Sequence, residues 1–516
     1  MAKTKLLIAA FAIVLTALMT GYSCLAIRFA PANSATDLIN QPLAVSWSDY
    51  GAAARNFVQQ ETTETALPYV PARSGDSDKL VIAHYFPPFP MSIDGGDPAH
   101  DYYETGYLDP AGEGGKHRDV GGYLRVRPLP AKLPRGYDYR RFNLAVEVAR
   151  AARIGIDAFG INLLTINSDE PLWRTSLDLL DAARAVSLTF KIVPEPDMTS
   201  IGDRVTTEQL AAALEVFGRH AASYHTRDGR LLVMPFAAEA KSAVWWRDLQ
   251  DRMVARGVPI ALVPVFVDRA RLPSFASFVA GASTWGDRYA SAAVANTRSA
   301  QASRLLGIGK WIMPIAFQDY RPKDRMVSET RNSEGWRAQW QSALSTRSEG
   351  VHLVTWNDYS ESTQVAPTRP GGFGIYDLTG YYIAWFKRGA PPPVVRDAIY
   401  LVYRHQLLRS DVGAGSPLRI DGPTALTNDI EAISILQSPA TIRLQVGRST
   451  EVSNAPAGFS AIRMKAVPGK PIVTLDRPGS LPIPFSRNVT IVERSATQDA
   501  TYYGESLIRD GSRSGS

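Results

Sequence analysis

The stretch Ile156–Leu164, with the sequence IDAFGINLL, is almost wholly apolar and follows an amphipathic stretch from Arg140 to Arg153. A helix followed at once by a short apolar run is typical of a parallel sheet whose strands are buried on both faces. A similar apolar run occurs earlier at Leu80–Phe86 (LVIAHYF) and later at Val351–Trp356 (VHLVTW). The pattern therefore indicates an α/β fold built on parallel strands.

The alternation of strand and helix repeats from Lys79 to about Arg409. Further strands are expected at residues 190–194, 231–236, 260–266, 282–285 and 311–317, and further helices at 172–186, 207–222, 241–256, 274–280, 299–306, 333–346 and 381–387. Eight such repeats are the number that closes a (β/α)8 TIM barrel, which we predict for residues 79–409. The alternative, a doubly wound open sheet, usually has fewer units and needs a phosphate loop, and no G-x-G-x-x-G motif follows the first run.

A different pattern begins after about residue 409. Short alternating runs with turn residues between them lie at 430–436, 440–446, 458–467, 472–476 and 489–493, and the helical pattern disappears. This pattern predicts a small C-terminal all-β sandwich over residues 410–508, followed by a polar tail at 509–516.

The N-terminal segment has the layout of an export signal. Lys3 and Lys5 precede an uncharged run from Leu6 to Ile27. Residues 1–27 are therefore expected to be a signal peptide cleaved after Ala26, or an uncleaved anchor, since about 20 apolar residues can span a bilayer. We expect a secreted, periplasmic or cell-envelope protein that contacts a membrane only through this segment, if it is retained.

Residues 28–78 are rich in Ala, Ser, Thr, Pro and Asn and are expected to be a linker. The chain has one cysteine, Cys24, inside the export segment. Cleavage would leave no thiol, which excludes disulfides, cysteine metal sites and cysteine nucleophiles.

The overall composition excludes a nucleic-acid-binding protein. The chain has 516 residues, 45% of them hydrophobic, and its 56 basic and 50 acidic residues are scattered along the sequence. No block of Lys and Arg stands out, and aromatic residues are not interleaved with basic ones. The length indicates one large domain and something smaller, and we expect a monomer.

Polar side chains follow nearly every predicted strand, where a TIM barrel carries its active site. A single acid at such a place is more simply a helix N-cap or a solvated loop residue, but its recurrence over most strands favours a site. The residues are His84 and Tyr85, Asn162, Glu195 and Asp197, Glu239, Asp268, Trp285 and Asp287, Gln318 and Asp319, and the segment Trp356–Glu361.

Acids mixed with aromatic and amide side chains suit carbohydrate chemistry. Glycosidic cleavage uses one protonated and one ionised carboxyl group, and the protonated group needs a raised pKa. Asp358 and Glu361, beside Trp356 and Tyr359, offer such a pair. The alternative is an N-capping pair at the start of the next helix.

Other chemistries find little support. The 7 histidines are dispersed, and neither an H-x-x-x-H pair nor a calcium loop is present, so no metal is expected. No G-x-S-x-G elbow indicates a serine hydrolase, and no motif implies a cofactor.

Five segments of the sequence resemble glycoside hydrolase family 71, the α-1,3-glucanases or mutanases, and more distantly the family 99 endo-mannosidases. The most specific is Thr355–Ser362, which carries a W-N-D-x-x-E motif, with Ser360 where the family usually has Gly. The other four are His84-Tyr85, Ile156–Phe159 with Asn162, Pro196–Met198, and Asp228–Arg230 leading to Phe236–Glu239. The resemblance runs from Lys79 to about Gly469.

The resemblance implies an inverting endo-hydrolase of α-1,3-glucan in which Glu361 is the general acid and Asp358 handles the water. Inversion requires carboxyl groups about 6.5–9.5 Å apart, and if these two are closer, Glu239 or Asp287 becomes the partner. The residues expected to bind the polysaccharide are His84, Tyr85, Asn162, Asp197, Glu239, Trp285, Asp287, Trp356, Asn357 and Tyr359.

The loop from Pro87 to Arg127 departs from the compact loop of the fungal family members. Another α-linked envelope glycan, such as an α-mannan, therefore remains an alternative substrate, and a non-catalytic glycan-binding protein is an alternative function. The polar and aromatic residues of this loop are Asp97, Asp101, Tyr102, Tyr103, Tyr107 and His117.

Overall fold

A computed structural model describes residues 45–63, 67–87, 124–408, 418–495, 498–507 and 512–513 of the chain. The predicted export segment and most of the polar tail lie outside these residues. So do the loop residues Asp97, Asp101, Tyr102, Tyr103, Tyr107 and His117. In the described ranges, no helix combines the length and apolar character needed to cross a membrane.

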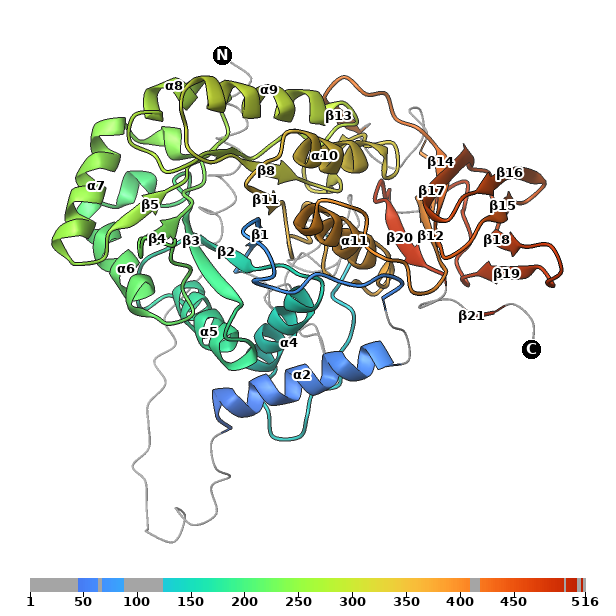
Figure 1. The fold of residues 1–516 in the computed structure, drawn as a ribbon, viewed down its shortest axis with the longest axis horizontal. Coiled ribbons are helices and arrows are strands. Elements are labelled where there is room, and N and C mark those ends of the chain that lie inside the picture. Colours follow the sequence, from blue (N-terminus) through green and yellow to red (C-terminus); the bar gives the residue numbers. More distant parts are fainter. Residues whose placement is uncertain are drawn as a thin grey trace, which may run out of the picture.

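A five-stranded parallel sheet lies at the centre of the structure, in the order β3-β2-β1-β11-β8 (Figure 1). Its strands are β1 (Leu80–Tyr85), β2 (Ala158–Leu163), β3 (Lys191–Pro196), β8 (Ile312–Ile315) and β11 (Gly350–Leu353). Nearly all of their residues are buried on both faces, as their continuous apolar runs predict.

Two short parallel pairs continue this arrangement. Strand β4 (Leu231–Val233) pairs with β5 (Ile260–Leu262), and β6 (Val265–Phe266) pairs with β7 (Ser283–Thr284). The run predicted as one strand over 260–266 is thus divided, and Pro264, which has no N–H to donate, lies at the division.

Single parallel bridges connect these pairs to one another and to the larger sheet. Asp197 just after β3 bridges to Phe236, which bridges in turn to Val265 of β6. Ala282 just before β7 bridges to Trp311 just before β8. The parallel strands therefore follow one another in chain order from β1 to β11.

Helices cover the outside of the parallel strands (Figure 1). Among the described residues, the α-helices after β1 are α4 (Tyr139–Arg153), α5 (Pro171–Val186), α6 (Thr207–Arg219), α7 (Ala243–Ala255), α8 (Leu272–Phe275), α9 (Ala292–Leu305), α10 (Glu334–Ser345) and α11 (Gly374–Arg388). In the ranges that the structure describes, three 3₁₀ turns accompany them: η3 (Gly202–Arg204), η4 (Ala238–Ala240) and η5 (Arg269–Arg271).

Local signals explain several of the helix starts. Asp138 accepts a hydrogen bond from the N–H of Arg141, and Thr206 forms a capping box with Gln209. Helices α9 and α11 begin seven residues earlier than predicted, at Ala292 and Gly374. The first turns of α11 are buried on nearly all sides, so they show no alternation of polar and apolar faces.

A helix precedes the first strand, and it corrects the predicted linker over residues 28–78. Helix α2 (Trp47–Thr63) packs on α4 and α5 and buries Tyr50, Ala54 and Val58. A side chain at Gly51 would lie 2.3 Å from the carbonyl oxygen of Ala185, so the two helices touch through their backbones. The linker prediction is wrong for these residues, because a face of small residues resembles linker composition.

Two antiparallel sheets form the C-terminal part, coloured orange to red in Figure 1. The first has the order β17-β14-β12-β20, and its strands are β12 (Ala398–Tyr403), β14 (Asp429–Leu436), β17 (Gly458–Lys465) and β20 (Tyr503–Ser506). The second has the order β16-β15-β18-β19-β21, and its strands are β15 (Ala440–Val446), β16 (Ser449–Ala455), β18 (Pro471–Asp476), β19 (Ile483–Ser486) and β21 (Ser512–Arg513).

Strand β12 belongs to these sheets although it precedes the boundary predicted at residue 410. It pairs with β14 and β20, and its side chains alternate between two cores. Leu401 packs into the core between the two antiparallel sheets, whereas Tyr400 packs into the core of the α/β part. The residues expected to form a strand at 489–493 make only single bridges, through Ile491 and Val492.

The two parts of the chain touch at backbone distance. A side chain at Gly374, the first residue of α11, would lie 2.3 Å from the carbonyl oxygen of Gly504 in β20. A side chain at Gly504 would in turn meet Ile375. A third sheet also joins the parts, because β10 (Met326–Ser328) pairs with both β9 (Asp319–Arg321) and β13 (Arg419–Asp421).

Candidate active site

Asp358 and Glu361 lie on a tight turn that follows β11, and both are nearly buried. Oδ1 of Asp358 accepts hydrogen bonds from the N–H of Ser360 at 3.0 Å, from its hydroxyl at 2.6 Å and from the N–H of Glu361 at 3.1 Å. This is the short-range pattern by which Asp stabilises turns. The next helix, α11, begins only at Gly374, so the two acids are not its N-capping pair.

Glu361 contacts an arginine that arrives from a different part of the chain. Its Oε1 lies 2.9 Å from Nη1 of Arg321, whose Nε and Nη2 both lie 2.9 Å from the carboxylate oxygens of Asp319. A second guanidinium, that of Arg288, lies 3.4 Å from Oδ2 of Asp319. Two-pronged arginine–carboxylate contacts of this kind fix both groups in place.

The electrostatic surroundings favour one protonated carboxyl group in this cluster. Burial raises the pKa of Glu361 to about 8, with the charges of Asp358 and Asp319 adding to the effect and that of Arg321 opposing it. Arg321 lowers the pKa of Glu361 only in part, because its positive charge is also paired with the carboxylate of Asp319. Burial also raises the pKa of Asp358, while hydrogen bonds from Ser360 and Glu361 favour its ionised form. Two acids that share one buried site cannot both ionise easily.

Deeper in the structure, Glu195 lies between two histidines. Its Oε2 is 2.5 Å from Nδ1 of His84, and its Oε1 is 3.1 Å from Nε2 of His352. Burial alone would raise the pKa of Glu195, but the charges of His352 and His84 lower it to about 2. A side chain at Gly160 would lie 1.9 Å from Oε1 of Glu195, so the carboxylate occupies the space that this glycine leaves.

Asn162 joins His84 to Asp197. Its Nδ2 lies 3.3 Å from Nε2 of His84 and 3.4 Å from Oδ2 of Asp197. Oδ1 of Asp197 accepts hydrogen bonds from the N–H of Thr199 at 2.9 Å and from its hydroxyl at 2.6 Å, and burial raises the pKa of Asp197. Trp285 lies edge-on to His84, with ring centroids 4.8 Å apart.

Glu239 and Asp287 have partners of their own further along the strand ends. Oε1 of Glu239 accepts hydrogen bonds from the N–H groups of Val267 at 2.9 Å and Asp268 at 2.6 Å, and burial raises the pKa of Glu239. Oδ2 of Asp287 accepts hydrogen bonds from Arg269 at 2.7 Å and from the hydroxyl of Tyr289 at 3.1 Å.

Four more of the predicted binding residues are buried, as His84, Asn162 and Asp197 are. Tyr85 donates its hydroxyl to Oε2 of Glu147 in α4 at 2.6 Å. Trp356 and Tyr359 are almost fully buried. The amide of Asn357 accepts from the N–H of Phe86 at 2.8 Å and donates to its carbonyl at 3.1 Å, which ties β1 to the turn. Successive strand residues point to opposite faces, so His84 contacts Glu195 on one side of β1 while Tyr85 contacts Glu147 of α4 on the other.

Sequence reasoning gave no role to Arg321, Arg288 and His352. Glu195 and Asp319 were recognised only as acids at strand ends. A signal existed for His352, because it lies in a predicted strand otherwise made of apolar residues. No periodic pattern marks Arg321, which lies on a short hairpin.

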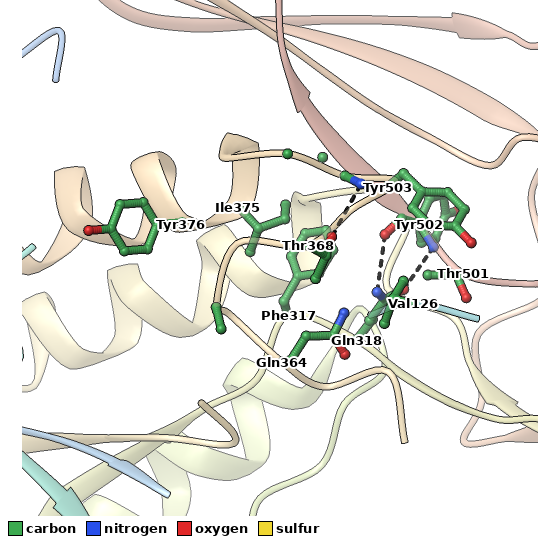
Figure 2. A pocket seen from close by; sticks show the side chains of 14 residues that line it. Val126, Phe317, Gln318, Gln364, Thr368, Ile375, Tyr376, Thr501, Tyr502 and Tyr503 are labelled. Atoms are coloured by element: carbon green, nitrogen blue, oxygen red, sulfur yellow. Dashed lines mark hydrogen bonds between the residues drawn. The ribbon is translucent and has the colours of Figure 1, made fainter. Parts of the chain in front are cut away.

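Figure 2 shows a cavity beside this region, lined by Gln318, Tyr502 and Thr368 among others. Its volume of about 20 Å³ has room for about one water molecule, which is too little for a sugar ring.

Two curated proteins are similar in sequence to this chain. A mutanase of Penicillium rubens is 25% identical over 350 residues, which cover 62% of this chain and 75% of the relative. A glucan endo-1,3-alpha-glucosidase of Schizosaccharomyces pombe is 22% identical over 348 residues, which cover 63% of this chain and 81% of the relative. Among solved structures, a family 99 endo-alpha-mannosidase of Bacteroides thetaiotaomicron matches with a TM-score of 0.46 and 12% identity, over 60% of this chain and 98% of that one.

Buried carboxyl groups with raised pKa values, such as those of Asp358 and Glu361, are able to act as general acids and bases. The profile of glycosyl hydrolase family 71 matches residues 135–503. The chain belongs to glycosyl hydrolase family 71, and the resemblance recognised from its motifs is confirmed. It is a glycoside hydrolase.

Proposed function

We propose that this enzyme is an inverting endo-hydrolase that cleaves α-1,3-linked glucan. The substrate is supported by the two relatives, which are named as a mutanase and a glucan endo-1,3-alpha-glucosidase. The fold we propose is a closed (β/α)8 barrel followed by a β-sandwich. It is supported by the parallel bridges that continue the sheet from Asp197 to Phe236 and Val265, and from Ala282 to Trp311.

The buried pair Asp358 and Glu361 carries the proposal. Glu361 is the general acid, since its raised pKa of about 8 leaves it protonated at neutral pH. We assign Asp358 as the general base, since hydrogen bonds from Ser360 and Glu361 to its Oδ1 oppose the rise in its pKa that burial causes.

In the proposed mechanism one proton is taken from water and one is given to the leaving oxygen. Asp358 takes a proton from water as the water oxygen forms a bond to the anomeric carbon. The bond from that carbon to the leaving oxygen breaks, and the leaving oxygen takes the proton of Glu361. Water attacks from the opposite face, so the configuration at the anomeric carbon inverts.

The other strand-end residues would bind the polysaccharide. We assign the holding of sugar hydroxyls to His84, Asn162 and Asp197, which already form one hydrogen-bonded chain. Trp285 beside them would contact a ring. Further subsite residues would be Glu239 and Asp287, while Tyr85, Trp356, Asn357 and Tyr359 would support the strand ends from behind.

The proposal is tested on purified enzyme with α-1,3-glucan, α-1,4-glucan and α-mannan. We expect α-1,3-glucan to be cleaved, and NMR of the first products to show the inverted anomer. Glu361→Gln and Asp358→Asn should each lose about 100- to 10,000-fold in kcat while the melting temperature is unchanged.

The control is Asp251→Asn, a change at an exposed acid of α7, which should keep full activity. Full activity of both amide variants would refute the catalytic pair. Activity on the mannan alone would refute the substrate, and a retained anomer would refute inversion.

We further propose that the enzyme acts outside the cytoplasm. The support is the charged start and uncharged run of residues 3–27. Cell fractionation with N-terminal sequencing of the mature protein tests it, and recovery in the cytoplasm with an intact Met1 would overturn it.

A further inference from the structure

The hairpin of β9 and β10 supplies two of the charged groups beside Glu361. Asp319 and Arg321 both lie in β9, and the residue between them, Tyr320, donates its backbone N–H to the carbonyl oxygen of Glu361 at 2.9 Å. The hairpin therefore contacts the proposed acid through both backbone and side chain. Its position decides whether Arg321 reaches Oε1 of Glu361.

The end of the C-terminal part holds this hairpin at its first residues. The amide of Gln318 donates to the carbonyl oxygen of Tyr502 at 3.1 Å and accepts from the N–H of Tyr502 at 2.8 Å, as Figure 2 shows. The hydroxyl of Tyr320 donates to the carbonyl oxygen of Gln498 at 2.9 Å. Tyr320 also packs in a small buried cluster with Leu408 and Ala500.

The other strand of the hairpin is held as firmly. Strand β10 pairs with β13, which lies in the C-terminal half of the chain. Just beyond β10, the buried carboxylate of Glu329 accepts hydrogen bonds from the side chain of Arg404 at 3.0 Å, the N–H of Thr427 at 3.1 Å and the hydroxyl of Tyr502 at 2.8 Å. Because this buried carboxylate has three hydrogen-bond partners from the C-terminal part, it fixes the end of β10 to that part.

We propose that the C-terminal part is a positioning element of the active site. Its hydrogen bonds to Gln318 and Tyr320 fix the hairpin, and the fixed hairpin keeps Arg321 in contact with Glu361. In this view the antiparallel sheets do more than cover the barrel or bind glycan. They set the contact between the acid and its arginine. The inference rests on the proposed role of Glu361 as the general acid.

The pKa of Glu361 depends on the charged groups around it, so a change in the position of the hairpin can be measured through this pKa. The charged groups that face Glu361 are Arg321 and Asp319 from the hairpin, Asp358 from its own turn and Arg288 from the segment after β7. Arg321 is the strongest influence that favours the ionised form of Glu361. A loosened hairpin would therefore raise the pKa of the acid and move the alkaline limb of the activity profile to higher pH.

The variant that tests the proposal is Tyr320→Phe, which removes one hydroxyl and keeps the ring. Tyr403→Phe is the matched control, because it removes a buried tyrosine hydroxyl of the C-terminal part that donates to Glu505 at 2.9 Å and not to a residue of the hairpin. For Tyr320→Phe we expect kcat on α-1,3-glucan to fall about two- to tenfold, the loss of one hydrogen bond. We also expect an alkaline limb at higher pH and an unchanged KM.

Tyr403→Phe should keep both kcat and the alkaline limb, even if its melting temperature falls. Gln318→Ala, measured in the same way, gives a second variant on the same contact. Equal pH profiles for all three variants and the parent enzyme would overturn the inference. If Glu361→Gln itself stayed active, the proposed function would fail first; if it is inactive and the profiles are still equal, only the positioning role fails.

Discussion

Oε2 of Glu195 lies 2.5 Å from Nδ1 of His84, and both side chains are buried at the ends of parallel strands. A proton must lie between these atoms, so Nε2 of His84 is left to face Asn162, 3.3 Å away. Glu195 therefore fixes the orientation of the His84 ring, to which we assign the holding of sugar hydroxyls. The same carboxylate also lies against His352, which has no exposed surface.

Replacing Glu195 by Gln should destabilise the enzyme, because two buried histidines would lose their common anion. The free energy of unfolding should fall by about 3–5 kcal/mol, and kcat/KM should fall with it. Urea denaturation and initial rates measure both effects. Glu215→Gln, which breaks solvent-exposed contacts with Arg219 and Arg256, should lower the free energy of unfolding far less. Equal losses in the two variants would contradict the role of Glu195.

Gly160→Ala should displace the carboxylate of Glu195, since the new methyl carbon would lie 1.9 Å from its Oε1. We expect a loss of about 1–3 kcal/mol in the free energy of unfolding, with reduced activity. The matched control is Gly202→Ala, where the nearest atom would be 3.6 Å away, an ordinary contact. A Gly160→Ala enzyme as stable and active as that control would show that the site tolerates the shift.

The activity of the enzyme should fall as the pH rises through about 8, the pKa of Glu361, because the acid must carry a proton to give it to the leaving group. Asp319→Asn removes a negative charge and frees Arg321, so the pKa of Glu361 should fall and the alkaline limb should move to lower pH. Arg321→Gln removes the opposing charge and should move the limb to higher pH. A pH series of kcat/KM for the three enzymes measures this, and shifts in the same direction for both variants would contradict the assignment.

Glu147 should make stability depend on pH. Burial raises the pKa of this carboxyl to about 7 from 4.5, against the hydrogen bond from Tyr85. The folded state thus holds its proton more tightly than the unfolded state. The resulting stabilisation is complete below pH 4.5 and is lost as the pH rises to about 7, by roughly 3 kcal/mol at most.

Glu147→Gln, which keeps an acceptor for the Tyr85 hydroxyl, should remove this dependence. Thermal denaturation between pH 4 and pH 8 compares the two proteins, because the remaining pH dependence is common to both. Identical slopes for the variant and the parent would show that Glu147 does not titrate in this range.

The parallel strands could be predicted from sequence because their burial on both faces leaves continuous apolar runs, as in Ile156–Leu164. The turn that holds Asp358 and Glu361 could be located by its motif. The contact between Glu361 and Arg321 could not, since a hairpin too short for periodicity carries the arginine. Helix α2 escaped prediction because close packing at Gly51 and Ala54 favours the same small residues that a linker uses.

The burial of Tyr85 and Trp356 shows a different limit. Successive side chains at the end of a strand point to opposite faces of the sheet, and one of these faces packs against the helices. A shift of one residue along the strand therefore changes which face a given side chain takes. The sequence shows that such residues gather at strand ends. Only the structure tells that His84 contacts Glu195 and that Tyr85 contacts Glu147.

The contact of Gly374 with Gly504 bears on how this enzyme can be recombined with its relatives. Neither position has space for a methyl group, so a chimera that takes its α/β part from one parent and its last strands from another would clash unless both parents contribute glycine there. A chimera whose sequence changes from one parent to the other between Gly374 and Gly504 would combine two contact surfaces that come from different proteins. The two parts of the chain are thus constrained to be inherited together, even though each has its own hydrophobic core.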